Sequence, residues 1–475
     1  MATGSDDEQA LQRLGYAQQL RRGMGAFGSF ALSFSVISIL TGAVSLYGFG
    51  LNHGGPIEMT VGWPLVTLMT LSVALSLAEL ASAYPTAGAL YHWASILGGR
   101  RLGWVTGWLN LVGQVAVVAG VDYALAEFAC AAVREAPSRA EVLGVYALVL
   151  LSHGLLNHVG IRVVTVLNEL SAWYHLAGTA LLVGALVWLA PLQPASFLFE
   201  RFVGAEADRP VVYPFAYACL IGLLQAQWTF TGYDASAHAS EETVGAREAA
   251  PRGIVSSVLV SGVVGAIMLV AITLAIRNLP AAAAASNPFV YIVKTALGGR
   301  LGQAMVWMVI GAMWFCGLSS VTSNSRMLFA FARDGGPPLA STLALVSDRF
   351  RTPTWAVWTC VVTAFALAVW GRAYSVIVSI STIGLYAAYG LPILAAFRAR
   401  REGRCARGPW QLGGWSPLLN LIALAWIAFI TVLFVLPPNE RTGYTFAGLV
   451  ALLAVGWYGG ADKGYRGPAR LSSEP

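Results

Sequence analysis

The sequence predicts an all-α polytopic membrane protein with 12 transmembrane helices. Of its 475 residues, 57% are hydrophobic and only 11% are charged, whereas a soluble globular protein has about 25% charged residues. So few charges cannot cover a water-exposed surface, and most of this surface must therefore face lipid. Twelve apolar runs also approach the length of about 20 residues that a helix needs to cross a bilayer.

These runs follow one another along the chain, separated by short connections. We expect spans near residues 26–49, 60–83, 103–132, 141–158, 164–190, 213–238, 252–276, 303–331, 355–371, 374–397, 417–436 and 443–459. Two other apolar segments are too short to span. Residues 287–299 are expected to form a short helix on the outer surface, and residues 84–101 a re-entrant or interfacial piece on the cytoplasmic side.

Both ends of the chain are expected to be cytoplasmic tails, at residues 1–24 and 461–475. The N-terminal stretch opens acidic and lacks the short apolar core of a signal peptide. With the N-terminus inside, most Lys and Arg residues fall in cytoplasmic connections, among them the cluster at 398–407. We therefore expect a multi-pass protein of the plasma membrane with both termini in the cytoplasm.

Missing motifs exclude several classes of function. The five cysteines form no CxxC pair, which argues against a zinc site. The sequence has no HExxH, GxSxG or GxxxxGK[ST] motif, and its positive charges are spread over many loops. We therefore expect neither an enzyme nor a nucleic-acid-binding protein, and no cofactor. The lipid bilayer is the expected surrounding, and the oligomeric state is left open.

Two of the expected spans contain residues that a helix in lipid usually avoids. FSVISILTGAVSLYGFG (34–50) contains Ser38, Thr41 and Gly42, and the sixth span continues as WTFTGYDASAHASEET (228–243), which contains Gly232 and Asp234. A break there would free backbone groups that cost several kcal/mol each unless they are paired. Small residues in spans also serve close helix packing, so this alternative stays open. Matched breaks in two halves of a chain, however, indicate a substrate site.

Four stretches resemble the amino acid–polyamine–organocation (APC) superfamily. Within it they are similar to the amino acid/choline branch of GABA permeases, choline permeases and bidirectional amino-acid transporters. The stretches are SFSVISILTG (33–42), AELASAYPTAGALYHWAS (78–95), FTGYDASAHASEET (230–243) and SNSRMLFAFARDGGPP (323–338). The resemblance implies a LeuT-type five-plus-five inverted repeat. Its two halves would lie at 25–190 and 210–400, followed by two additional C-terminal helices at 413–460.

The resemblance also implies which residues bind substrate. The carboxylate-binding turn of the first span corresponds to Leu40-Thr41-Gly42, next to Ser38. Many relatives have a glycine where this chain has Leu40, which is a departure from the pattern. In the sixth span the corresponding positions are an aromatic gate at Trp228 and unwound backbone for a substrate amine at Phe230, Thr231 and Gly232.

Titratable residues near the breaks are candidates for gating or coupling. A carboxylate at the depth of Asp234 is costly and therefore functional by default. The fifth span contains Glu169 and His175, and a histidine titrates near physiological pH. His175 is the candidate proton site, with a hydrogen-bonded structural histidine as the alternative.

Other polar residues have simpler expected roles. Glu79 and the Arg333-Asp334 pair are assigned to a gate network on the inner side. Glu241 and Glu242 are expected to be solvated, and Asp122 to reach water near the outer end of its span. Ser319 and Ser320 are possible sodium ligands, although hydroxyls in spans commonly bond to their own helix.

The leading hypothesis is a secondary active transporter of amino acids or related amines such as GABA. Substrate would bind at the two breaks by alternating access, and transport would be proton-coupled or an exchange. The alternative is a carrier of choline or another organic cation or polyamine. That alternative needs an aromatic box and a carboxylate, which Trp228, Phe230 and Asp234 would supply.

Overall fold

The computed structural model describes residues 4–134, 137–204, 214–370 and 374–468. Five predictions touch residues outside these ranges: part of the N-terminal tail, the half-boundary at 210, the start of the sixth span at 213, the end of the ninth span at 371, and part of the C-terminal tail. Within the described residues the chain is helical, with no β-strand. This part of the structure agrees with the predicted all-α class.

Ten helical segments in the described ranges are long and apolar enough to cross a membrane. The longer helices of these spans are α2 (Ala26–Ile37), α5 (Trp63–Ala83), α7 (Arg100–Val133), α8 (Arg139–Val159), α9 (Ile161–Leu189), α13 (Ala246–Leu274), α16 (Gly299–Arg333), α19 (Tyr374–Arg401), α20 (Ser416–Leu433) and α21 (Glu440–Gly456). The protein is therefore an integral multi-pass membrane protein. The predicted ninth span corresponds to the shorter apolar helix α18 (Thr354–Trp370).

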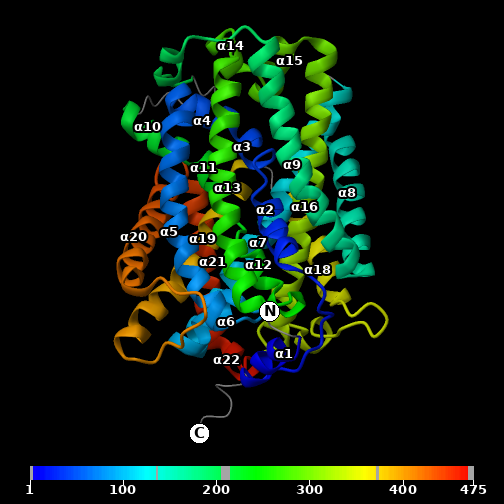
Figure 1. The fold of residues 1–475 in the computed structure, drawn as a ribbon, viewed down its shortest axis with the longest axis vertical. Coiled ribbons are helices and arrows are strands. Elements are labelled where there is room, and N and C mark those ends of the chain that lie inside the picture. Colours follow the sequence, from blue (N-terminus) through cyan, green and yellow to red (C-terminus); the bar gives the residue numbers. More distant parts are fainter. Residues whose placement is uncertain (1–3, 135–136, 205–213, 371–373, 469–475) are drawn as a thin grey trace.

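The long helices run side by side along the long axis of the molecule (Figure 1). The N-terminal helix α1 (Gly4–Arg13) and the C-terminal helix α22 (Asp462–Gly464) lie at the same end of this bundle. We call it the terminal end. The short helices α14 (Leu279–Ala284) and α15 (Pro288–Leu297) lie at the opposite end.

The first span does not continue as one helix. Helix α2 ends at Ile37, and winding resumes in two short pieces, α3 (Gly42–Ser45) and α4 (Tyr47–His53). Ser38 has a left-handed backbone with φ 39°, a conformation that L-residues other than glycine rarely adopt. This residue turns the chain out of the helix.

The predicted sixth span is also divided. It contains α10 (Phe215–Gly222), α11 (Leu224–Thr229) and α12 (Ala235–His238). The gap between α11 and α12 contains Gly232 with φ 77°, which glycine adopts without steric cost. Every residue from 221 to 243 is buried, so the segment lies inside the protein rather than in an exposed loop.

The two short apolar segments form helices, with different surroundings. The stretch 287–299 contains α15, which packs on α16 and begins with an Asn287 side-chain cap. The stretch 84–101 contains α6 (Ala89–Gly98), whose residues Leu90, Tyr91, His92 and Trp93 are fully buried. Helix α6 packs between α7 and α19, so the interfacial alternative was wrong, while the re-entrant alternative stays a prediction.

Candidate functional site

The two interrupted segments cross in direct contact. A Cβ atom added to Gly42 would come within 2.8 Å of the Cα atom of Thr229, so only glycine allows this approach of α3 to α11. The amide of Gln225 in α11 donates to the carbonyl of Ala43 in α3, at 2.9 Å. The sequence therefore places both chain breaks at one point in the bundle.

The first break leaves backbone donors unpaired. The N–H groups of Thr41 and Gly42 both donate to the Ser38 carbonyl, at 2.8 and 3.0 Å. The N–H groups of Ile39 and Leu40 have no acceptor among the described residues. Because a buried N–H without a partner is rare in native proteins, these two groups mark a place where a ligand acceptor would be stabilising.

His175 in α9 holds the first break in place. Its Nε2 atom lies 2.6 Å from the Ser38 hydroxyl and its Nδ1 atom 2.8 Å from the Ser171 carbonyl. The Ser38 hydroxyl also lies 2.6 Å from that of Thr41. Both ring nitrogens are thus paired while the ring is neutral. Glu169, on the same helix, is half-buried beside Gly28 of α2.

Tyrosines of α19 pair with the second break. Tyr386 donates its hydroxyl to the Phe230 carbonyl at 2.7 Å. The Gly232 N–H donates to the Tyr389 hydroxyl at 3.0 Å. Thr231 lies between Phe230 and Gly232 in the chain, and its carbonyl accepts no hydrogen bond from the described residues.

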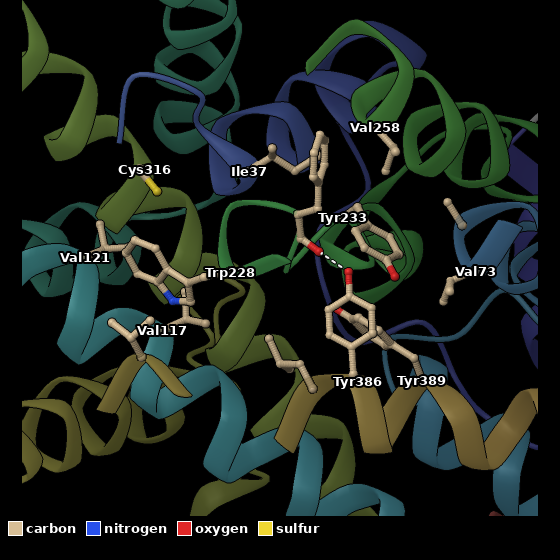
Figure 2. Close-up of a cluster of buried hydrophobic side chains, with 14 of the residues drawn as sticks. Ile37, Val73, Val117, Val121, Trp228, Tyr233, Val258, Cys316, Tyr386 and Tyr389 are labelled. Carbon is tan, nitrogen blue, oxygen red and sulfur yellow. Dashed lines mark hydrogen bonds between the residues drawn. The ribbon is translucent and has the colours of Figure 1, made fainter. Parts of the chain in front are cut away.

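A small cavity lies between the breaks. Its walls comprise Val36, Ile37, Thr41, Gly42, Val117, Val121, Trp228, Thr229, Thr231 and Cys316. Figure 2 shows the Trp228 ring beside Val117 and Val121 of α7, and its indole N–H donates to Ser381 in α19 at 3.1 Å. The room left between these side chains is close to that of one water molecule. This space is therefore too small for an amino acid in this structure, and none of the cavity-lining residues is charged.

Asp234 faces away from this cavity, into a polar cluster. Its Oδ1 atom accepts from the Tyr389 hydroxyl at 2.8 Å, and its Oδ2 atom lies 3.0 Å from Nε2 of His238. Asp234 and His238 are 1% and 0% exposed. The His238 ring continues to the Ala87 carbonyl through Nδ1 at 2.9 Å, and Asn110 of α7 lies 3.1 Å from Nε2.

Comparison with known proteins identifies the family to which this architecture belongs. A family model described as amino acid permease matches residues 25–457. The amino-acid permease BAT1 of Arabidopsis thaliana is 37% identical over 497 aligned residues, which cover 96% of this chain and 95% of the relative. The chain belongs to the amino acid permease family. The predicted membership of the APC superfamily is thereby confirmed.

Further relatives of this permease come from other organisms. The BAT1 homologue of Oryza sativa subsp. japonica is 36% identical, with coverage of 98% of this chain and 96% of the relative. Amino-acid permease 2 of Neurospora crassa is 27% identical, covering 98% and 90%. Permeases are transporters of small molecules and not enzymes, so the predicted class of function is confirmed.

At the terminal end of the permease, two carboxylates expected in solvent are buried. Glu242 pairs with Arg326 of α16 at 2.8 Å, both 0% exposed, and Glu241 pairs with Arg333 at 2.8 Å. The expectation that Glu241 and Glu242 are solvated was wrong, because Arg326 and Arg333 of α16 pair with them. Arg326 was missed in the sequence, where its position among apolar residues in SNSRMLFAFAR was the available signal.

Asp334, which follows α16, closes the same cluster. It accepts from the Tyr16 hydroxyl at 2.9 Å and from the Tyr91 hydroxyl at 3.0 Å. Burial raises the pKa of Asp334 to about 7 from the usual 3.8, against the lowering effect of Arg333. The N-terminal tail, through Tyr16, is therefore part of the packed terminal end.

Glu79 belongs to a different cluster from Arg333 and Asp334. It pairs with Arg400 and accepts from the Leu412 N–H at 2.9 Å and the Ser416 hydroxyl at 2.7 Å. Glu79 therefore anchors the connection between α19 and α20, and it shares no hydrogen bond with Arg333 or Asp334.

Three hydroxyl and carboxylate groups in the spans have partners within the protein. Ser319 donates to Asn168 at 2.7 Å or to its own helix, and Ser320 to the Cys316 carbonyl at 2.8 Å. Asp122 is fully buried and lies 3.1 Å from His153 of α8. The expectation that Asp122 reaches water was wrong, because α8 and α16 cover it.

Proposed function

We propose that this permease is a secondary active transporter of amino acids or close relatives such as GABA, working by alternating access with substrate between the two breaks. The single observation that best supports this is the contact of two interrupted helices around unpaired backbone groups. Unwound segments that meet near the middle of a bundle are the usual basis of such sites.

The first break suits a carboxylate. The Ile39 and Leu40 N–H groups lie next to Ser38, Thr41 and Gly42, and buried N–H groups without an acceptor favour an anionic partner. Leu40 restricts the approach, because its side chain is fully buried against Gly178 of α9. A substrate with a carboxylate on a flexible chain, as in GABA, fits this restriction better than a bulky α-amino acid.

The second break suits an ammonium group. The Thr231 carbonyl accepts no hydrogen bond from the described part of the chain, and rotation of Tyr386 would release the Phe230 carbonyl as well. Trp228 lines the cavity and would stack on a cation, worth about 0.5–2 kcal/mol. A choline carrier would need a carboxylate at the cavity, whereas Asp234 is held by Tyr389, and this favours the amino acid over the organic cation.

In this proposal the chain has the five-plus-five inverted repeat of the LeuT type with two additional C-terminal helices. Both termini are cytoplasmic, in the plasma membrane, so the terminal end is the inner side. Proton coupling or exchange supplies the energy.

Uptake into proteoliposomes tests the proposal. Purified permease is reconstituted and given labelled L-alanine, L-glutamate, GABA and choline, with and without pH and sodium gradients. We expect uptake of at least one of the first three, with unlabelled substrate accelerating counterflow. Uptake of choline alone would contradict the choice of substrate class, and sodium dependence would contradict proton coupling.

A further inference from the structure

The hydrogen bonds of His238 require one proton more than a neutral imidazole beside an ionised carboxylate can supply. Nδ1 faces only the Ala87 carbonyl among the described residues, at 2.9 Å. A carbonyl only accepts, so Nδ1 must be protonated. Nε2 then faces Oδ2 of Asp234 at 3.0 Å, and an ionised carboxylate also only accepts. A further proton must therefore lie between the two atoms, on one or the other.

The neighbouring amides indicate where this proton lies. Gln114 donates to Oδ1 of Asn110 at 2.9 Å, which turns the Asn110 amide nitrogen toward Nε2 of His238, at 3.1 Å. In this arrangement Nε2 is an acceptor and the proton resides on Oδ2 of Asp234. The opposite arrangement, with an imidazolium and a carboxylate, contains the same number of protons.

Three other buried histidines do not need an extra proton. His175 bonds to a hydroxyl and a carbonyl, and His92 bonds to the hydroxyls of Thr86 and Tyr16. His153 faces Asp122 through Nδ1 alone, and its Nε2 atom has no partner within the described residues. The hydrogen bonds of each of these rings can form while the imidazole is neutral. The requirement distinguishes the Asp234–His238 pair from them.

We propose that the Asp234–His238 pair binds the coupling proton of this permease, and that this proton holds the terminal end closed. The inference rests on the transport function proposed above. It assigns the proton to a residue pair other than His175, which instead positions the first break.

Loss of the proton weakens the closure because one contact of His238 must become repulsive. If Nδ1 keeps its proton, the lone pair of Nε2 faces an ionised carboxylate. If the proton shifts to Nε2, the lone pair of Nδ1 faces the Ala87 carbonyl. Ala87 lies in the turn before α6, and its N–H donates to Glu241 at 3.1 Å, so this turn joins the terminal-end cluster to α12.

The pair is also connected to the substrate cavity. Tyr389 bridges Asp234 to the Gly232 N–H, and Gly232 follows the cavity-lining Thr231. A change at Asp234 therefore reaches both the second break and the closing turn. The proton leaves to water at the terminal end once this turn moves.

The charged groups around the pair are themselves paired. From α19 the pair faces Tyr389, and from α7 the neutral amide of Asn110. From α16, Arg326 and Arg333 are neutralised by Glu242 and Glu241. Helix α2 presents the uncharged residues Ser29 and Ser33 to Ser236 of α12, and helix α13 presents Gly253.

The test separates gradient-driven accumulation from exchange in the same proteoliposomes. Labelled L-alanine, L-glutamate and GABA are offered to wild type, His238→Gln and Asp234→Asn, first with an outside-acid gradient of one pH unit and then in counterflow at equal pH. At one proton per substrate, wild type should accumulate substrate about tenfold. The variants should exchange substrate and reach no accumulation above equilibration. Exchange also shows that a variant is folded.

Asp122→Asn is the matched control, since it removes the carboxylate of the other buried Asp–His pair. It should retain accumulation. The proposal is overturned if His238→Gln and Asp234→Asn still accumulate substrate, or if Asp122→Asn loses accumulation to the same extent. Wild type that exchanges but ignores the gradient overturns proton coupling alone, whereas wild type without exchange of any probe overturns the transport proposal itself.

Discussion

Gly232 is the residue on which the shape of the second break depends most. Its φ of 77° is strained for any side chain, and an added Cβ would clash with Val36 of α2. We expect Gly232→Ala to destabilise the permease by about 1–2 kcal/mol through the backbone and by about 1–3 kcal/mol through overpacking. Thermal unfolding in detergent measures this, together with uptake.

Gly245→Ala is the control for this change. Gly245 also has a positive φ, of 65°, but an added Cβ would meet no atom within 4 Å. Its substitution should show the backbone cost alone. An equal loss of stability in both variants would contradict the role assigned to the contact with Val36.

The buried pair Glu242–Arg326 provides a second test at the level of single residues. Removal of one partner leaves an uncompensated charge in the interior, which costs about 3–5 kcal/mol. We therefore expect Glu242→Ala to lower the unfolding midpoint strongly. Glu248→Ala disrupts the exposed pair with Arg252, whose side chains are 59% and 69% exposed, and should cost less than about 1 kcal/mol. Equal midpoints in the two variants would refute this difference.

At the scale of elements, ten of the twelve predicted spans correspond to described helices that are long and apolar enough to cross a membrane, because hydrophobic length is a local property. The stretch 103–132 lies within α7, and 303–331 within α16. The breaks near Ser38 and Gly232 could also be predicted, since Gly, Ser and Thr in an apolar run indicate local irregularity of the backbone. Both are properties of a few consecutive residues.

Contacts between residues that are far apart in the sequence could not be predicted in this way. Tyr386 and Tyr389 lie about 155 residues after the break that they pair with, and nothing in a run of apolar residues indicates which helix faces which. For the same reason the sequence suggested that Glu241 and Glu242 are loop carboxylates, whereas in the structure they pair with Arg333 and Arg326 of α16.

We expect the stability of the folded permease to depend on pH through Asp334, which follows α16. The pKa of Asp334 rises from 3.8 in the unfolded chain to about 7 in the folded one because the carboxyl is buried. The folded state therefore binds more protons between these values, and its stability falls as pH rises from about 4 to about 7. We expect the unfolding midpoint of wild type to fall more steeply from pH 5 to pH 7 than that of Asp334→Asn. Parallel profiles would argue against this effect of Asp334.

At the scale of the whole molecule, the N-terminal tail packs into the terminal end. Tyr16 bonds to Asp334 and His92, its ring lies 3.9 Å from the Arg333 guanidinium, and Asp7 accepts from the Gly245 N–H at 2.7 Å. The tail thus joins α6, α13 and α16. Its removal should shift the permease toward a conformation open at this end.

Cysteine labelling measures that shift. In a background without the native cysteines, Ser240→Cys places a thiol at a position that is 1% exposed. Adding Tyr16→Phe should increase the rate of labelling by a membrane-impermeant maleimide, because the hydrogen bonds of the tail are lost. Adding Tyr458→Phe, at an exposed tyrosine, should leave the rate unchanged. Slow labelling in both would contradict a closing role for the tail.

The small space between the two breaks should limit the leakage of protons through the permease. With room for about one water there, and with the pair Glu242–Arg326 fully buried, we expect no continuous file of water through the residues that the structure describes. Protons cannot hop along such an interrupted path. Vesicles that contain the idle permease should therefore keep an imposed acidity difference as long as vesicles of lipid alone.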